Sequence, residues 1–171
     1  NALSILVKSD VATGATMAFR ANLIKYIFPI PSLCFHDAWI TFIATTVSKI
    51  VAIEKPLILY RQHDANIIGG RRISLFQHIQ KSIHISPQWF DNEILRSNNL
   101  LQRIREIHEH DVHGIYTEDL EKKIRHLLNR KKMFGAPFWQ RIFPVARELL
   151  TFRYFKYSRG VFSIFVDLFI R

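Results

Sequence analysis

Apolar residues recur at helical spacing between residues 38 and 47 and would lie on one face of a helix. The positions on that face are Trp39, Ile40, Phe42, Ile43 and Val47. Asp37 stands immediately before the run, behind a loop that contains Pro29 and Pro31. The pattern therefore predicts a helix from Asp37 to about Ser48.

The other segments of the first seventy residues predict a mixture of helix and strand. The stretch 21–28 reads as a short helix that Pro29 ends, and 3–7 fits either a strand or a short helix. Residues 16–19, 49–54 and 57–61 are predicted strands, the second for its β-branched content. We expect an α/β fold for this part.

After Gly70 the pattern becomes helical. Helices are predicted over 71–85, from Pro87 to about His110, from a Thr117 cap to about residue 132, and across a break near Pro144. The apolar run from Val161 is short, contains Asp167, and falls below the roughly 20 residues that cross a bilayer. The chain thus divides into residues 1–70 and a helical extension, 71–171.

Charge is unevenly distributed along the chain, whose formal net charge is +10. Residues 1–70 carry six Lys or Arg against four acids, and residues 71–171 carry eighteen against ten. Between 130 and 171 the balance is nine against two, with eleven aromatic residues. Basic and aromatic side chains together favour an anionic surface, either lipid headgroups or nucleic acid. The single cysteine, Cys34, excludes an internal disulfide and fits a small apolar role.

An acid at the start of a helix has two possible roles. Asp37 can accept the free amide hydrogens of the first turn as a cap. It can also point from the helix into a cleft and act as a general base. The residue pattern alone leaves both roles open.

Three motifs occur in order in the first seventy residues: TGATMAFR at 13–20, FHDAW at 35–39 and PLILYRQHDANIIG at 56–69. Together they resemble the C-terminal half of the catalytic domain of family 2 glycosyltransferases. The resemblance is closest to bacterial, rhamnosyltransferase-like enzymes of surface polysaccharide synthesis, such as O-antigen synthesis. It implies the C-terminal part of a GT-A, Rossmann-like domain, followed by the helical extension.

The resemblance also implies roles for particular residues. Asp37 matches the general base, with His36 supporting it or simply packing. Thr13 and Gly14 match a segment that lines the sugar and acceptor cleft, or they form an ordinary turn. Trp39 would meet the sugar or pack in the core.

The third motif implies contacts with the donor. Arg61 and Gln62 match a substrate-binding segment, and His63 would either add a ligand to a divalent metal, Mg or Mn, or remain a loop residue. In the family the metal is held mainly by an Asp-x-Asp motif in the N-terminal half, and the 171 residues contain no Asp-x-Asp. The chain opens with Asn1 and shows no signal peptide, so we expect a fragment that is inactive without the nucleotide-binding half.

The expected reaction is inverting transfer of a sugar from a nucleotide-sugar donor to a saccharide or lipid-linked acceptor. We expect a cytoplasmic protein, peripheral at the inner membrane, that contacts an anionic lipid surface through residues from about Arg130 onward and has no nucleic-acid partner. The tail aromatics Phe162, Phe165 and Phe169 could instead pack on the catalytic domain. The rival function is a non-catalytic basic helical module that binds anionic membrane or nucleic acid.

Overall fold

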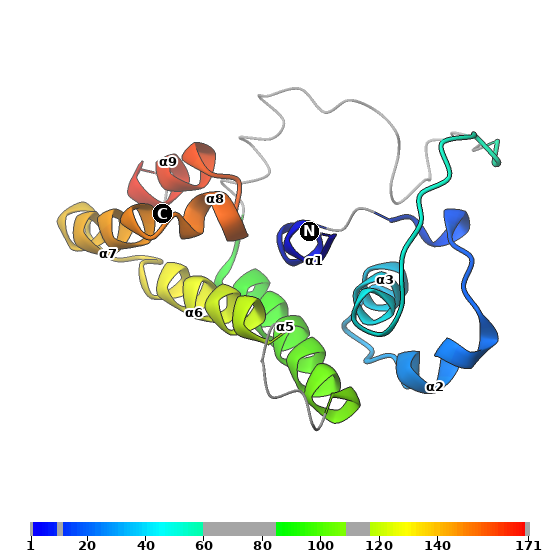
Figure 1. Ribbon diagram of the computed structural model, residues 1–171. Helices are drawn as coiled ribbons and strands as arrows, with labels where there is room; N and C mark the ends of the chain where they lie inside the picture. Colours follow the sequence, from blue (N-terminus) through cyan, green and yellow to red (C-terminus); the bar gives the residue numbers. More distant parts are fainter. Residues whose placement is uncertain (1, 10–11, 60–84, 109–116, 170–171) are drawn as a thin grey trace.

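The computed structural model describes residues 2–9, 12–59, 85–108 and 117–169, and every regular element in these ranges is helical (Figure 1). The first part contains α1 (Ala2–Lys8), the 3-10 turns η1 (Gly14–Thr16) and η2 (Ala21–Leu23), α2 (Ile24–Ile27) and α3 (His36–Val47). The second part contains α5 (Pro87–Ile107), α6 (Glu118–Lys132), α7 (Phe138–Leu150), α8 (Arg153–Tyr157) and α9 (Val161–Phe169).

The prediction of an α/β, GT-A-type fold is wrong, because no strand forms anywhere in the described ranges. The predicted strand at 16–19 is a 3-10 turn followed by irregular chain. Residues 49–59 form no regular element and are exposed, with Leu59 102% exposed and Val51 71%. β-Branched content measures how well a residue suits a pleated surface, whereas a sheet also requires partner strands.

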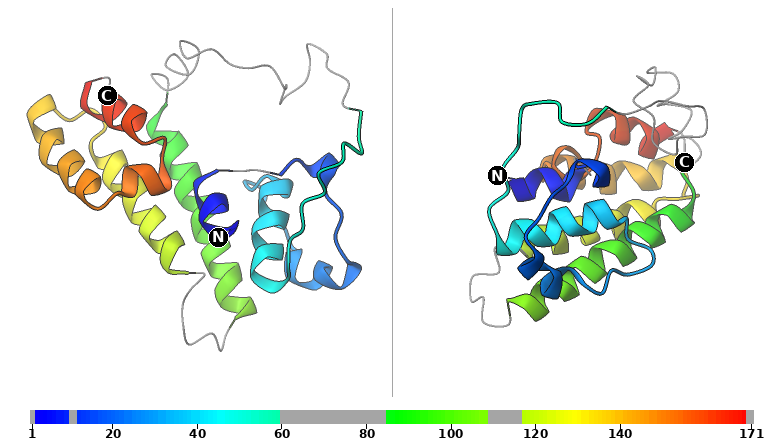
Figure 2. Two further views of the ribbon diagram at one scale, coloured as in Figure 1. Left: turned by 45° about the horizontal axis from the view of Figure 1, so that its top comes forward. Right: turned by 90° about the vertical axis from the view of Figure 1, so that its right-hand side faces the viewer.

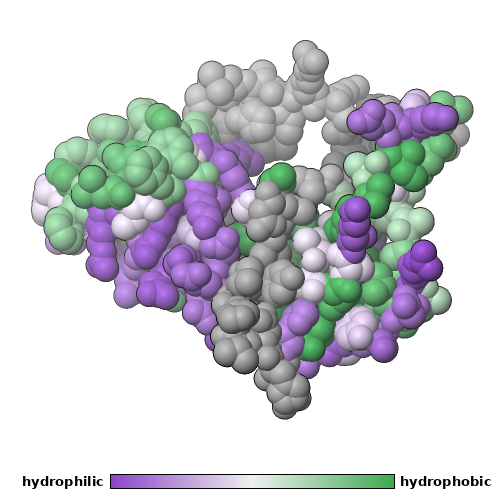
Figure 3. Space-filling view, in the orientation of Figure 1, coloured by the Kyte–Doolittle hydropathy of each residue, from purple (hydrophilic) through white to green (hydrophobic). Residues whose placement is uncertain are grey.

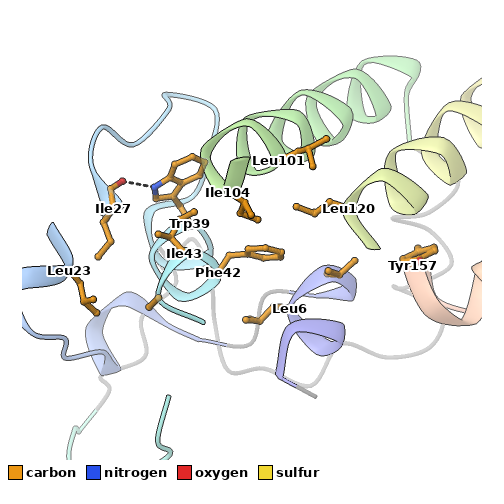
Figure 4. Packing of buried hydrophobic residues seen from close by; sticks show 12 residues of the cluster. Leu6, Leu23, Ile27, Trp39, Phe42, Ile43, Leu101, Ile104, Leu120 and Tyr157 are labelled. Carbon is orange, nitrogen blue, oxygen red and sulfur yellow. Dashed lines mark hydrogen bonds between the residues drawn. The ribbon is translucent and has the colours of Figure 1, made fainter. Parts of the chain in front are cut away.

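The helix predicted from Asp37 is confirmed as α3, and it lies at the centre of the larger apolar cluster. Trp39, Phe42 and Ile43 are buried between α1, α2 and α5 (Figure 4). The indole N–H of Trp39 donates a hydrogen bond of 2.7 Å to the carbonyl oxygen of Ile27. This bond satisfies the only polar atom of the ring, so the indole can be buried at little cost.

Two arginines of α5 attach the first part of the chain to the helical extension. Arg96 donates to the carbonyl of Leu33 at 2.6 Å, and its guanidinium lies 4.6 Å from the ring centroid of Phe35. Arg103 donates to three carbonyls at the end of α2, those of Lys25, Tyr26 and Phe28. These bonds satisfy helix-end carbonyls that would otherwise lack donors.

The same apolar cluster takes Leu101, Ile104, Leu120 and Tyr157 from the helical extension. The two parts divided at residue 70 in the sequence therefore share one core. The boundary itself, and the helix predicted over 71–85 apart from Ile85, lie outside the described residues.

The helices of the extension lie side by side, α5 against α6 and α7 against α9 (Figures 1 and 2). The predicted start at Pro87 is confirmed, and Thr117 occupies the N-cap position of α6 without a side-chain cap bond. The predicted break at Pro144 is wrong, since α7 continues through it. Proline removes one backbone hydrogen bond, and the burial of neighbouring Val145 holds the helix together there.

The short elements at the end of the chain are joined by two residues with positive φ. Phe152 (φ 55°) separates α7 from α8, and Gly160 (φ 59°) separates α8 from α9. A Cβ on Gly160 would lie 3.0 Å from the ring of Phe155, so this turn requires glycine. None of the described helices is long and apolar enough to cross a membrane.

Candidate functional site

The His36–Asp37 pair opens α3. Phe35 holds the N-cap position, and Asp37 is the second residue of the helix. The amide of Ala38 donates to Oδ1 of Asp37 at 2.9 Å, so the carboxylate binds one first-turn amide without standing at the cap itself. Asp37 is half-buried and His36 is exposed. Neither residue forms an ion pair with another described residue, and part of the Asp37 surface is exposed.

Gly14 lies against the imidazole of His36. A Cβ built on Gly14 would be 2.5 Å from Nε2 of His36, well inside contact distance. The loop is tied to α3 by a second contact, a hydrogen bond of 3.1 Å from the hydroxyl of Thr41 to the sulfur of Met17. The structure therefore brings together two of the three segments that carry predicted site residues.

Thr13 precedes this contact and shapes the turn. Its carbonyl accepts hydrogen bonds from the backbone N–H and the hydroxyl of Thr16, both at 2.8 Å. The side chain of Thr13 is exposed and makes no cap bond to η1. Its hydroxyl is thus accessible beside the Gly14–His36 contact.

The side chain of Trp39 does not reach the surface that carries His36 and Asp37. It is 2% exposed, and its N–H is bonded to the backbone of α2. A sugar could stack on the ring only after this packing had changed. In this conformation Trp39 packs in the apolar cluster near the start of α3.

The remaining predicted site residues, Arg61, Gln62 and His63, lie outside the described part of the chain, so their roles stay predictions. Within the described ranges, no three His, Cys, Asp or Glu side chains gather as a metal site needs. Burial raises the pKa of the Cys34 thiol above its usual value, which keeps it protonated and poorly nucleophilic.

A buried polar network joins α6, α7 and the end of α8, and it was not predicted from the sequence. Nδ1 of His126 lies 2.6 Å from Oε2 of Glu148, and Nε2 lies 2.8 Å from the hydroxyl of Ser158. Asn129 and Arg153 both donate to the other oxygen of Glu148. Burial lowers the pKa of His126 despite the hydrogen bond with Glu148, so the neutral ring donates to Glu148 and accepts from Ser158.

The second half of the network centres on Arg130 and Asp167. Arg130 donates to both carboxylate oxygens of Asp167, at 2.7 and 3.1 Å, and to the hydroxyl of Ser158 at 2.8 Å. The hydroxyl of Tyr154 donates to Asp167 at 2.8 Å. Burial and the neighbouring carboxylate of Asp167 raise the pKa of Tyr154, so its phenol remains a donor.

The order Ser158–His126–Glu148 matches the hydrogen bonds of a nucleophile, base and acid. Ser158, however, is also held by Arg130, and each of the three side chains is more than nine-tenths buried. Saturated hydrogen bonding and burial of this kind favour a cross-link between helices. The sequence offered one signal for it: His126 and Arg130 stand four residues apart, on one face of α6.

A pocket of about 660 Å³ lies beside this network. Its lining includes the cations Lys8, Lys123, Arg130 and Arg159 and one acid, Glu93. It contains none of the predicted site residues, so the pocket and the His36–Asp37 site are separate features.

Comparison of the chain with protein-family models, with curated proteins and with solved structures finds no match. The resemblance to glycosyltransferases therefore rests on the three motifs alone.

Proposed function

We propose that this chain carries the acceptor-side segment of an inverting glycosyltransferase. The enzyme transfers a sugar from a nucleotide-sugar donor to a saccharide or lipid-linked acceptor in surface polysaccharide synthesis. The three ordered motifs support the proposal, and the contact between Gly14 and His36 is the structural observation that carries it. That contact puts the segment proposed to line the cleft beside the proposed base.

In the proposed reaction an acceptor hydroxyl oxygen attacks the anomeric carbon of the donor. A new carbon–oxygen bond forms, and the bond from that carbon to the diphosphate breaks, with its electron pair leaving on the nucleoside diphosphate. The carboxylate of Asp37 takes the proton of the hydroxyl. Its Oδ1 accepts a hydrogen bond from the amide of Ala38, and this bond helps to fix the carboxylate in position.

The donor and a divalent metal would be bound by residues outside the described ranges. The 171 residues contain no Asp-x-Asp motif, and the described residues gather no set of metal ligands.

The test is Asp37→Asn in the full-length enzyme, with sugar transfer as the measurement. We expect the rate to fall by about two to four orders of magnitude, because asparagine cannot accept the proton. Asparagine can still accept the hydrogen bond from Ala38, so the melting temperature should stay nearly constant.

The matched control is Asp119→Asn. Asp119 is the second residue of α6, as Asp37 is of α3, and its carboxylate pairs with Lys156 at the surface. This change should leave the rate unaltered. Near-normal transfer by Asp37→Asn would leave Asp37 only its role in the first turn of α3.

A further inference from the structure

The outer face of α7 is apolar, whereas the face of α7 that packs against the protein carries charge. At 100° per residue, the six apolar side chains of the outer face fall within an arc of roughly 140°. They are Phe138, Trp139, Ile142, Phe143, Leu149 and Leu150, and all are exposed. The buried face of the same helix holds Arg141, Val145 and Glu148.

The helix α9 shows the same inversion. Val161, Phe165 and Phe169 follow one another at intervals of four residues and are exposed, while two polar residues, Ser163 and Asp167, are buried together with Val166. The alternative of tail aromatics packed into the core therefore fails for Phe165 and Phe169. A helix that packs on a protein in water normally shows the opposite pattern.

The two apolar faces form one surface, which we call the α7–α9 surface. The ring centroids of Phe138 and Phe169 are 5.7 Å apart, and those of Phe169 and Phe165 are 5.2 Å apart. Figure 3 shows this hydrophobic area over α7 and α9. Contiguous exposed apolar area of this kind marks an interaction site.

The charges of residues 130–169 identify the class of partner. The only acids in this segment are Glu148 and Asp167, which are 1% and 0% exposed. Exposed cations remain, including Lys132 before α7, Arg147 on α7 and Arg159 before α9. The segment therefore presents apolar rings and positive charge to its surroundings, with no exposed acid.

We propose that the α7–α9 surface docks on an anionic lipid bilayer, with its rings at the boundary between headgroups and acyl chains. Phenylalanine, tryptophan and leucine on one face with basic residues beside them are the composition of interfacial helices. Each basic residue near an anionic leaflet strengthens binding about fivefold. This docking is independent of the activity proposed above.

The test is co-sedimentation of the 171-residue chain with vesicles of phosphatidylcholine alone or mixed with phosphatidylglycerol. We expect binding to the anionic vesicles that weakens at 0.5 M salt, because a Debye length of only a few ångströms screens the cations. The triple variant Trp139→Ser, Phe143→Ser, Leu150→Ser should reduce the partition coefficient about tenfold or more. These three side chains are 71%, 76% and 80% exposed, so the fold should survive.

The matched control is Val51→Ser, Leu57→Ser, Leu59→Ser. It removes three apolar side chains of similar exposure, 71%, 71% and 102%, from a segment away from α7 and α9 (Figure 1). This variant should bind as the unchanged chain does. Thermal unfolding of both variants, followed by circular dichroism, checks that each remains folded.

Two results would overturn the proposal. One is an intact chain that does not bind the anionic vesicles. The other is self-association without lipid that the Trp139, Phe143 and Leu150 changes abolish, because this outcome would assign the surface to a second copy of the chain.

Discussion

The α3 region and the α6–α9 region hold together by opposite means. Around α3, apolar side chains fill the interior, and the hydrogen bond from Trp39 to Ile27 is the main polar link within it. Between α6 and α9 the apolar cluster is small, Met133, Val145 and Tyr154, and buried ion pairs and hydrogen bonds take its place. Both regions also leave apolar side chains exposed, among them Phe28 and Phe35 near α3 and Trp139 and Phe143 on α7. On α7 the exposed apolar side chains share one face of the helix, while its buried face holds Arg141 and Glu148.

Buried ion pairs and apolar contacts also respond differently to change. Apolar packing loses free energy in proportion to the area and cavity involved. A buried charge that loses its partner retains its full desolvation cost. Mutations and changes of pH should therefore affect stability differently in the two regions.

The largest effect should come from Arg130→Met. The change leaves the carboxylate of Asp167 buried without its guanidinium, which costs about 3–5 kcal/mol in the free energy of unfolding. The double variant Arg130→Met, Asp167→Leu should recover much of this loss, because both charges are then removed. Urea denaturation measures both.

The control for Arg130 is Arg105→Met. Arg105 pairs with Glu121 at 2.7 Å, but the two side chains are largely exposed. Its loss should cost less than about 1 kcal/mol. If Arg130→Met lowers the free energy of unfolding no more than Arg105→Met does, the buried pair contributes no more than a surface pair. The contrast between the two regions would then be wrong.

The α3 region is probed by Trp39→Phe. The phenyl ring keeps most of the apolar contact but leaves the carbonyl of Ile27 without its donor, at a cost of about 1–3 kcal/mol. The loss should be the same at pH 5.5 and pH 7.5, because the lost hydrogen bond joins the indole N–H to a backbone carbonyl, and neither group titrates in this range. A pH-dependent loss would mean that the two regions are coupled.

The smallest effect is the pH dependence contributed by His126. Its pKa in the folded chain lies below the ordinary 6.5. Just below pH 6.5, His126 therefore takes up a proton in the unfolded chain more readily than in the folded chain. Stability should then fall as pH falls, by at most about 1.4 kcal/mol per pH unit from this residue. The groups facing the ring are Glu148, Ser158, Arg130, Asp167, Tyr154 and Tyr157.

The variant His126→Gln identifies the origin of that slope. The amide can still hydrogen-bond but does not titrate, so the slope between pH 6.5 and pH 5 should flatten. Glu148 adds its own loss only at lower pH. Burial pushes its pKa upward, but hydrogen bonds from His126 and Asn129 outweigh this and hold it below the ordinary 4.5. An unchanged slope in the variant would assign the pH dependence to another group.

The sequence predicted helices well where the signal was local. The helical spacing of Trp39, Phe42 and Ile43 specified α3, and Pro87 specified the start of α5. The predicted strands were wrong because a strand depends on partners far away in sequence. Residues 49–54 have the composition of a strand but have no neighbour to pair with in the described structure.

For the candidate site, the resemblance placed Thr13 and Gly14 along a cleft and His36 beside the base. The structure brings Gly14 into contact with His36, while the roles of these residues stay predictions. The network of His126, Glu148 and Asp167 was missed, since these three residues stand 19 or more residues apart and each resembles an ordinary surface residue. The spacing of His126 and Arg130 was its one local signal. Only the folded helices bring the three residues together.

Phe152, in the turn between α7 and α8, has opposite effects on stability and on binding. A bulky residue in the left-handed region is strained by about 1 kcal/mol or more, and this ring is 71% exposed, so burial compensates for little of the strain. Directed evolution that selected only for thermostability would replace Phe152 with glycine or asparagine. It would thereby remove an aromatic ring next to the α7–α9 surface. The more stable protein would then bind its partner more weakly.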